Sequence, residues 1–264
     1  MKVKSIKDLL PVISQLQDNL GLNARQSFIE VYRGQSLNEY NLVSGISRYK
    51  HPLNEILKRE KNLTQRFIDA IKNKEIDFIQ EPYENQKGIF QKEWFYLFQG
   101  QHLNLKTRLM DWTICWETAL LFAVENEKYF GLDGQFWIYL CPKQNFIHNE
   151  NIEIIYNIHP LEVTNTYLIN QPFYQPDEED DFISERRRAR QFGRFLIQES
   201  KNILTPLENQ PEINNNLRKF IIDGNSKKRI KSELNEMGHI IEWKYYRQSE
   251  NIDEKINKMN DIMN

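Results

Sequence analysis

The sequence has little of what marks secreted, metal-binding or membrane-spanning proteins. Only two of its 264 residues are cysteines, Cys115 and Cys141, and they fit neither a disulfide framework nor the spacing of a metal site. No run approaches the ~18 apolar residues of a membrane span. The first residues lead into an amphipathic segment instead of an apolar signal core. We therefore expect a protein of the reducing cytoplasm that does not associate with membranes.

An excess of charge of either sign is also missing. The chain has 35 Lys and Arg residues against 37 Asp and Glu residues, so no global basic field points to nucleic acid, although local basic patches remain possible. His148, His159 and His239 are too scattered to form a ligand set, and we predict no metal. With 40% hydrophobic and 12% aromatic residues, the chain can bury a sizeable core as one domain.

Apolar periodicity predicts a mixture of helices and strands. The expected helices cover residues 5–20, 53–72, 90–102, 116–129, 226–236 and 252–263. The expected strands cover residues 28–32, 107–110, 135–140, 152–156, 193–198, 217–222 and 239–243. The class is α+β: a single domain with mixed or antiparallel sheets and several flanking helices. We expect an N-terminal helix in residues 1–24, the central domain in 25–245 and a C-terminal helix in 246–264.

The segment Gln101–Thr113 organises the chain. It contains an amide, an imidazole, a guanidinium, a carboxylate, an indole and two hydroxyls, and it lies between two strongly apolar stretches. A polar segment in such a place must satisfy its donors and acceptors internally or present them to a ligand.

Four separated motifs resemble those of the FRG domain family, which is named for an aromatic-Arg-Gly motif. The motifs are Tyr32-Arg33-Gly34-Gln35, the following Leu42, Ile46 and Arg48, the segment Gln101-His102 with Thr107–Thr113 followed by Ala119 and Phe122-Ala123, and Arg190-Gln191-Phe192-Gly193-Arg194-Phe195-Leu196. The resemblance covers roughly residues 25–245. Two positions depart from the family pattern, because Asn104 replaces a usual Gly and Lys106 a usual Pro. Asn tolerates left-handed backbone well, so the first change leaves the loop possible.

Arg33 and Asp111 are the charged residues on which a site would depend. Arg33 follows a strand and precedes Gly34, where its guanidinium could capture a carboxylate or phosphate or form a structural salt bridge. A buried Asp111 needs a cation or several amide donors, and Arg33, Arg48 and Arg108 are the candidates. We expect these four residues to converge with Gln101 and His102, either as a structural network or as a ligand site.

Three further residues have both a structural and a functional interpretation. His102 could act in acid–base chemistry or bind phosphate, or it could be a core histidine. Trp112 could belong to the core or form a stacking platform. Cys115 lies at a helix start, which can lower a thiol pKa, but no base is adjacent.

A charged stretch precedes the last motif. Arg186, Arg187 and Arg188 follow the acidic residues Glu178–Asp181. The simplest interpretation is a solvated loop with offsetting charges; a mobile lid or a nucleic-acid contact are the alternatives.

The order of the motifs is similar to the layout of ADP-ribosyltransferases, in which a first-strand Arg or His and a middle hydroxyl hold NAD and a late Glu fixes the ribose. This resemblance implies such a fold and gives Arg33, with Thr107 or Thr113, to NAD. The late position here is Gln191, which has no charge to stabilise an oxocarbenium-like centre, unless Glu185 or Glu199 substitutes.

These interpretations combine into one expected site. The resemblances imply a phosphate-containing small molecule, a nucleotide or NAD, and an ADP-ribosyltransferase-like toxin or phage-defence effector. The alternative is a non-catalytic sensor or an interaction module for nucleic acid or protein. The expected catalytic residues are Arg33, His102 and Gln191. The expected ligand-binding residues are Tyr32, Gly34, Gln35, Arg48, Gln101, Thr107, Arg108, Asp111, Trp112, Thr113 and Phe195.

Overall fold

The computed structural model describes residues 1–19, 27–76, 88–170, 193–238 and 250–264. Its α-helices are α1 (Ile6–Asn19), α3 (Leu53–Lys72), α4 (Gln91–His102), α5 (Trp116–Val124), α6 (Glu153–Tyr156), α8 (Pro211–Asn214), α9 (Lys227–Glu236) and α10 (Glu250–Asn260). Its strands are β1 (Lys2–Val3), β2 (Phe28–Gln35), β3 (Leu109–Thr113), β4 (Gly134–Pro142), β5 (Phe146–Ile147), β6 (Tyr167–Asn170), β7 (Gly193–Ile197) and β8 (Leu217–Ile222). The α+β class is confirmed.

Within the described residues, the strands form one mixed sheet in the order β1-β8-β4-β2-β3-β7-β6-β5. The pairs β1–β8 and β5–β6 are parallel and the others antiparallel. Helices α1, α5 and α9 pack on one face of the β8-β4-β2 half, where they share a core with Phe136, Ile138 and Phe220. Helices α4 and α6 cover the β3-β7-β6 half through a second core around Leu109 and Phe195.

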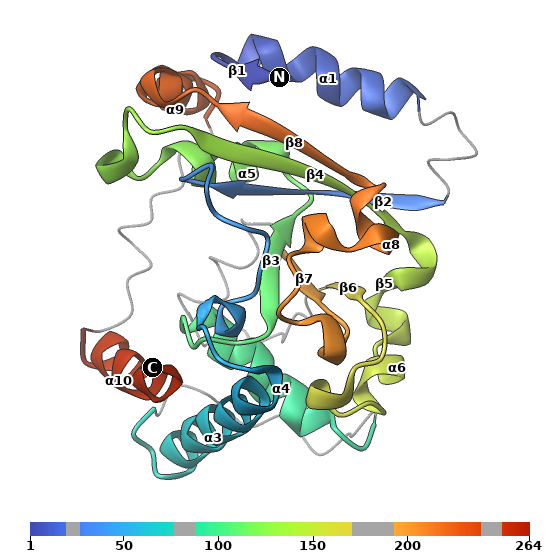
Figure 1. The fold of residues 1–264 in the computed structure, drawn as a ribbon, viewed down its shortest axis with the longest axis vertical. Coiled ribbons are helices and arrows are strands. Elements are labelled where there is room, and N and C mark those ends of the chain that lie inside the picture. The colour runs from blue at the N-terminus through green and yellow to red at the C-terminus, as the bar shows by residue number, and fades with distance from the viewer. Residues whose placement is uncertain (20–26, 77–87, 171–192, 239–249) are drawn as a thin grey trace.

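The two halves of the sheet meet at a single pair of residues. β2 and β3 are in register only at Tyr32 and Thr113, whereas β2 pairs with β4 along its whole length. Figure 1 shows β2, β4 and β8 crossing the upper part of the molecule while β3 descends toward α3 and α4. The sheet therefore opens between β2 and β3 just beyond this pair.

Gly34 is required by the approach of α5 to β2. A Cβ at Gly34 would lie 1.8 Å from the carbonyl oxygen of Ala119, far inside any allowed contact. The group that comes so close to the strand here is the backbone of α5. Gly34 thus brings the helix after the polar segment onto the strand that carries Arg33.

Some local predictions were wrong. Residues 152–156 were expected as a strand, but Glu153–Tyr156 form α6, because Ile152, Ile155 and Tyr156 recur at the spacing of one helix face and are all buried. Strand β3 begins at Leu109 instead of residue 107, and α5 ends at Val124 instead of near residue 129. The sequence also offers Thr113 as a cap for the helix that follows it, but the hydroxyl of Thr113 accepts from the N–H of Cys115, which is itself the N-cap residue of α5. The expected strand 239–243 lies outside the described residues.

A separate helical cluster holds the C-terminal end of the chain. Leu63 and Phe67 of α3 pack with Ile256 of α10 and with Met263 of the 3-10 helix η10 (Asp261–Met263). This cluster also reaches Leu103 and Leu105, which flank the loop after α4. In the part of the chain that the structure describes, no helix has the length and apolar character needed to cross a membrane.

Candidate functional site

A cavity of about 330 Å³ lies where β2 and β3 separate. Its walls come from β2, β3, the start of β7, the end of α4 with the loop that follows, α5, and the 3-10 helix η1 (Ile46–Arg48). The predicted site residues that line it are Tyr32, Arg33, Gly34, Arg48, Gln101, His102, Asp111, Trp112, Thr113 and Phe195. Four of the sequence motifs thus meet in one cavity although they are spread from residue 32 to residue 195.

Arg33 extends from β2 across the opening of the sheet. One of its terminal nitrogens donates to the backbone carbonyl of Asp111, an acceptor on the neighbouring strand. Its Nε is shielded from solvent and has no hydrogen-bond partner among the described residues. Burial lowers the pKa of Arg33 to about 10, the nearby Asp111 charge opposes this shift, and the like charge of Arg48 adds to it. The guanidinium is therefore incompletely compensated by the protein.

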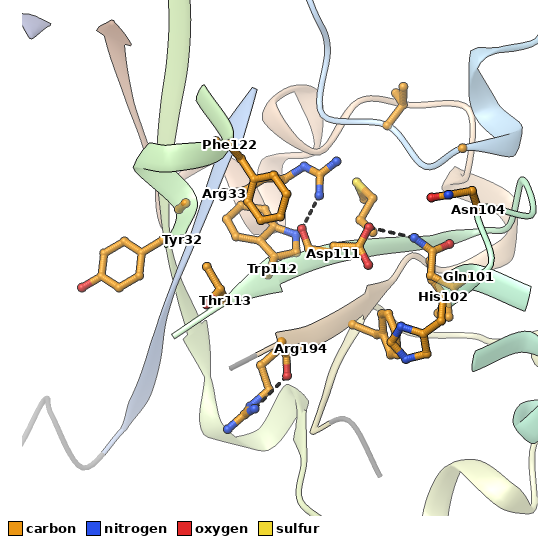
Figure 2. A pocket seen from close by; sticks show the side chains of 18 of the residues that line it. Tyr32, Arg33, Gln101, His102, Asn104, Asp111, Trp112, Thr113, Phe122 and Arg194 are labelled. Carbon is orange, nitrogen blue, oxygen red and sulfur yellow. Dashed lines mark hydrogen bonds between the residues drawn. The ribbon is translucent and has the colours of Figure 1, made fainter. Parts of the chain in front are cut away.

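Asp111 is exposed to the cavity and is oriented by a chain of hydrogen bonds. Its Oδ2 accepts from Nε2 of Gln101 at 2.8 Å, the hydroxyl of Thr107 donates to Oε1 of Gln101, and that hydroxyl accepts from the N–H of Leu109 at 3.1 Å. Figure 2 shows the Asp111 carboxylate turned toward Gln101, with Arg33 bonded to the backbone of the same residue. The chain fixes the amide of Gln101 so that it donates to the carboxylate.

Aromatic rings form part of the cavity wall. The His102 ring lies 5.3 Å from the ring of Phe195, which stacks on Phe98 at 5.4 Å. Trp112 is buried and packs against Tyr139 at 5.8 Å, so it belongs to the core. Its indole Nε1 has no hydrogen-bond partner among the described residues. Trp112 thus combines a core position with a donor that the protein leaves unsatisfied.

Sequence reasoning missed two cations and an aromatic ring in the cavity lining. Lys106, Arg194 and Phe122 all line the cavity. Burial lowers the pKa of Arg194, and for Lys106 burial and the charge of Arg48 both do so. Lys106 could have been identified as a cavity residue from its place inside the polar segment, and Arg194 from its place between Gly193 and Phe195. With Arg33 and Arg48, four cationic side chains and the single carboxylate of Asp111 line the cavity among the described residues.

Three predicted ligand-binding residues have structural contacts and do not line the cavity. Arg108 was a candidate partner of Asp111, but its guanidinium forms a two-pronged ion pair with Glu60 of α3, with nitrogen–oxygen distances of 2.8 and 2.5 Å. It is fully buried and also donates to Pro160 and Ser200. The hypothesis that Arg108 joins Arg33 and Asp111 is wrong, because a buried guanidinium needs a fully compensating partner, and α3 supplies it.

The other two residues, Thr107 and Gln35, hold neighbouring side chains in place by hydrogen bonds. Thr107 holds Gln101, as described above. Gln35 is buried at the end of β2, where its Oε1 accepts from Nε2 of Gln135 at 2.7 Å. Gln135 in turn donates to the carbonyl of Tyr40, so this pair fixes the loop after β2.

Some predicted residues lie outside the described residues: Gln191, Glu185 and the basic run Arg186, Arg187 and Arg188. Of the two glutamates that could replace Gln191, Glu199 does not line the cavity; it pairs with Lys201 at 2.8 Å and accepts from Asn202.

The pKa of the Cys115 thiol is raised, first by burial and also by Glu117, which opposes the lowering expected at a helix start. Among the described residues, no three His, Cys, Asp or Glu side chains are grouped as a metal ion requires.

Comparison with known proteins agrees with the first three motifs, whereas the motif around Gln191 lies beyond the matched region. The family model described as the FRG domain matches residues 29–131, which include β2, η1, α3, α4, β3 and α5. No curated protein and no solved structure matches the chain. The matched region supplies most of the cavity wall, and Gly193, Arg194 and Phe195 complete it from β7.

Proposed function

Because this chain carries an FRG domain, we propose that the cavity of that domain binds a phosphate-bearing small molecule of the nucleotide or NAD type. The observation that carries the proposal is Arg33. A guanidinium with a lowered pKa, a shielded Nε without a partner and no side-chain ion pair in the described residues gains free energy when an anion enters. Phosphate matches the planar fork of a guanidinium and forms two charge-assisted hydrogen bonds with it.

The rest of the cavity wall supports an anion over a cation. Arg48, Lys106 and Arg194 add positive charge to that of Arg33, and among the described residues of the cavity wall Asp111 alone carries the opposite charge. The shielded Nε atoms of Arg33 and Arg194 and the indole Nε1 of Trp112 are donors without a partner among the described residues. A buried donor without a partner carries a desolvation penalty, and a ligand rich in acceptors removes it.

Asp111 and Phe122 supply what a nucleotide needs beyond its phosphate. The Asp111 carboxylate is fixed by Gln101 and exposed to the cavity, so it can accept hydrogen bonds from ribose hydroxyls. The half-buried ring of Phe122 lines the same cavity and offers an apolar surface for a base.

Cleavage of NAD is a second candidate function, favoured by the presence of a carboxylate in the same cavity as Arg33. In that reaction the bond between nicotinamide and the ribose C1′ breaks, nicotinamide leaves with the bonding electrons, and water or an acceptor group bonds to C1′ and loses a proton. Asp111 would stabilise the positive charge that develops on the ribose, and His102, which lines the same cavity, would take the proton. An effector that consumes NAD would fit this chemistry, whereas binding without cleavage would fit a sensor.

The binding proposal is tested by thermal unfolding of the purified protein with AMP, ADP, ADP-ribose, NAD and inorganic phosphate. A ligand at about 100 times its Kd stabilises the native state by about 2.7 kcal/mol, which raises the Tm of a chain of this size by roughly 5–10 °C. Arg33→Gln removes the charge and is expected to abolish the rise. The matched control is Arg66→Gln, on the exposed surface of α3 and away from the cavity.

The result that decides between the two functions is the release of nicotinamide from NAD, followed by chromatography. Release that Asp111→Asn abolishes supports cleavage. A rise in Tm with intact NAD supports a sensor. If none of the compounds raises the Tm, the proposed function is wrong.

A further inference from the structure

The outer part of the cavity contains two cations, Arg48 and Lys106, which backbone contacts bring together. The N–H of Ile46 in η1 donates to the carbonyl of Thr107 at 3.1 Å. Gly45 packs directly on the other segment, since a Cβ there would lie 3.3 Å from the carbonyl oxygen of Thr107 and 3.4 Å from the Cα of Lys106. The helical turn that ends at Arg48 is thus fixed against the segment that carries Lys106.

The segment that carries Lys106 is held from its other side by the C-terminal end of the chain. The side-chain Oδ1 of Asn260 accepts from the N–H of Lys106 at 2.8 Å, and its Nδ2 donates to the carbonyl of Asn104 at 3.1 Å. Asn260 is only 6% exposed. Asn104 itself takes the left-handed conformation, with φ of 65°. The loop around Lys106 is therefore held in position from two sides, by η1 and by the end of α10.

The charges of these residues interact. Arg48 lowers the pKa of Lys106 and also adds to the lowering at Arg33, so Arg48 is within electrostatic reach of both other cations. In the residues that the structure describes, neither the Arg48 nor the Lys106 side chain has a hydrogen-bond or ion-pair partner. Two cationic side chains whose backbones are held next to each other repel one another, and an anion from solution can compensate both charges.

We propose that Arg48 and Lys106 form a second phosphate subsite beside Arg33, and that the ligand class is therefore a nucleoside diphosphate or a compound that contains one, such as ADP-ribose. The inference rests on the proposed function and adds the number of phosphates to it. One phosphate on Arg33 leaves the two outer cations without a counter-charge. A diphosphate carries a second group, joined to the first, that can reach them.

The experiment measures the affinities of AMP, ADP, inorganic phosphate and pyrophosphate by titration calorimetry at low salt. Wild-type protein is expected to bind ADP more tightly than AMP by on the order of tenfold or more, the size of one additional charge-assisted contact. Pyrophosphate is expected to exceed phosphate in the same way, which makes the preference independent of the base. The preference should shrink as salt is raised, because exposed charges are screened.

Variants assign the preference to the two residues. Arg48→Ala and Lys106→Ala are each expected to reduce ADP affinity toward that of AMP while AMP affinity stays within about twofold. The matched control for Lys106→Ala is Lys50→Ala, an exposed lysine close to η1 that does not line the cavity. Arg66→Ala serves in the same way for Arg48→Ala.

Each outcome supports or overturns a defined statement. Equal binding of AMP and ADP by the wild-type protein overturns the second subsite and leaves the proposed function standing. The subsite is also overturned if Arg48→Ala and Lys106→Ala weaken AMP and ADP to the same extent. If none of the four compounds binds, the second subsite is overturned, and the proposed function fails with it when ADP-ribose and NAD also leave the Tm unchanged.

Discussion

Removing the negative charge from Glu60 should destabilise the protein much more than removing it from Asp111. Both are changed to the amide of the same shape, Asp111→Asn and Glu60→Gln. Glu60 and its partner Arg108 have side-chain exposures of 2% and 0%, so Glu60→Gln leaves a guanidinium unpaired in the core. Breaking such a pair costs about 3–5 kcal/mol, a large part of the ~5–15 kcal/mol that stabilises a typical domain.

Asp111→Asn is expected to cost no more than about 1 kcal/mol. The carboxylate is exposed, Arg33 binds the backbone carbonyl of this residue and not its side chain, and the oxygen of an asparagine can still accept from Gln101. The electrostatic attraction between Asp111 and Arg33 is lost, but this attraction crosses a solvent-exposed cavity. The substitution should therefore leave the fold intact and act on the ligand.

The assay is urea unfolding at pH 7.5 together with thermal unfolding. At roughly 2–4 °C per kcal/mol for a chain of this size, Glu60→Gln should lower the Tm by roughly 6–20 °C and Asp111→Asn by less than about 4 °C. The double variant Glu60→Met with Arg108→Met is expected to recover most of the loss, since an apolar replacement removes both charges from the core. An Asp111→Asn protein as unstable as Glu60→Gln would refute the reasoning, because it would mean that the cavity carboxylate holds the fold together.

Further predictions concern the cavity wall. Gly34→Ala should destabilise the protein by at least about 3 kcal/mol, seen as insoluble protein or a low Tm, because the new Cβ collides with the Ala119 carbonyl; a normal Tm would contradict the close approach of α5 to β2. Asn260→Ala should lower the affinity for ADP more than that for AMP and reduce stability by about 1–3 kcal/mol through two lost hydrogen bonds; an equal effect on both ligands would make Asn260 merely structural. The affinity for pyrophosphate should decline as pH rises through the pKa of Lys106, which is held below the ordinary lysine value, since the cation is lost there; in Lys106→Arg the decline should move to higher pH, and an unchanged profile would exclude Lys106 from the site.

Much of the secondary structure followed from local pattern. The helix at residues 53–72 and the strand at 217–222 have the predicted bounds, because apolar side chains repeat there at one clear period. The short strands β1, β5 and β6 were not predicted. Two of them have only two residues, too few for an alternation, and they exist because a neighbouring strand pairs with them.

The candidate site was predictable in composition and not in its contacts. The motifs named most of the residues that line the cavity, and Asn104 takes the left-handed backbone that its side chain tolerates. Lys106 was missed because a charged residue inside a polar segment has no periodicity that tells which way it points, and Arg194 was noted only as a member of the last motif. Gly34 lets the backbone of α5, and not a ligand, approach β2, and this could be seen only once the neighbours of Gly34 in the fold were known.

The sequence by itself determined that Tyr32–Gln35 and Gln101–Thr113 hold the polar groups of this protein and that the chain around them folds as an α+β domain, since hydrophobic period and composition act locally. Only the tertiary structure decided which residue each arginine contacts. Arg108 lies three residues from Asp111 but pairs with Glu60, 48 positions away, while Arg33 reaches Asp111 across 78 positions. The physical reason is that successive residues of an extended strand point to opposite faces, so near neighbours in sequence enter different environments. Their partners are then supplied by whichever helix or strand the packing of the core brings to that face.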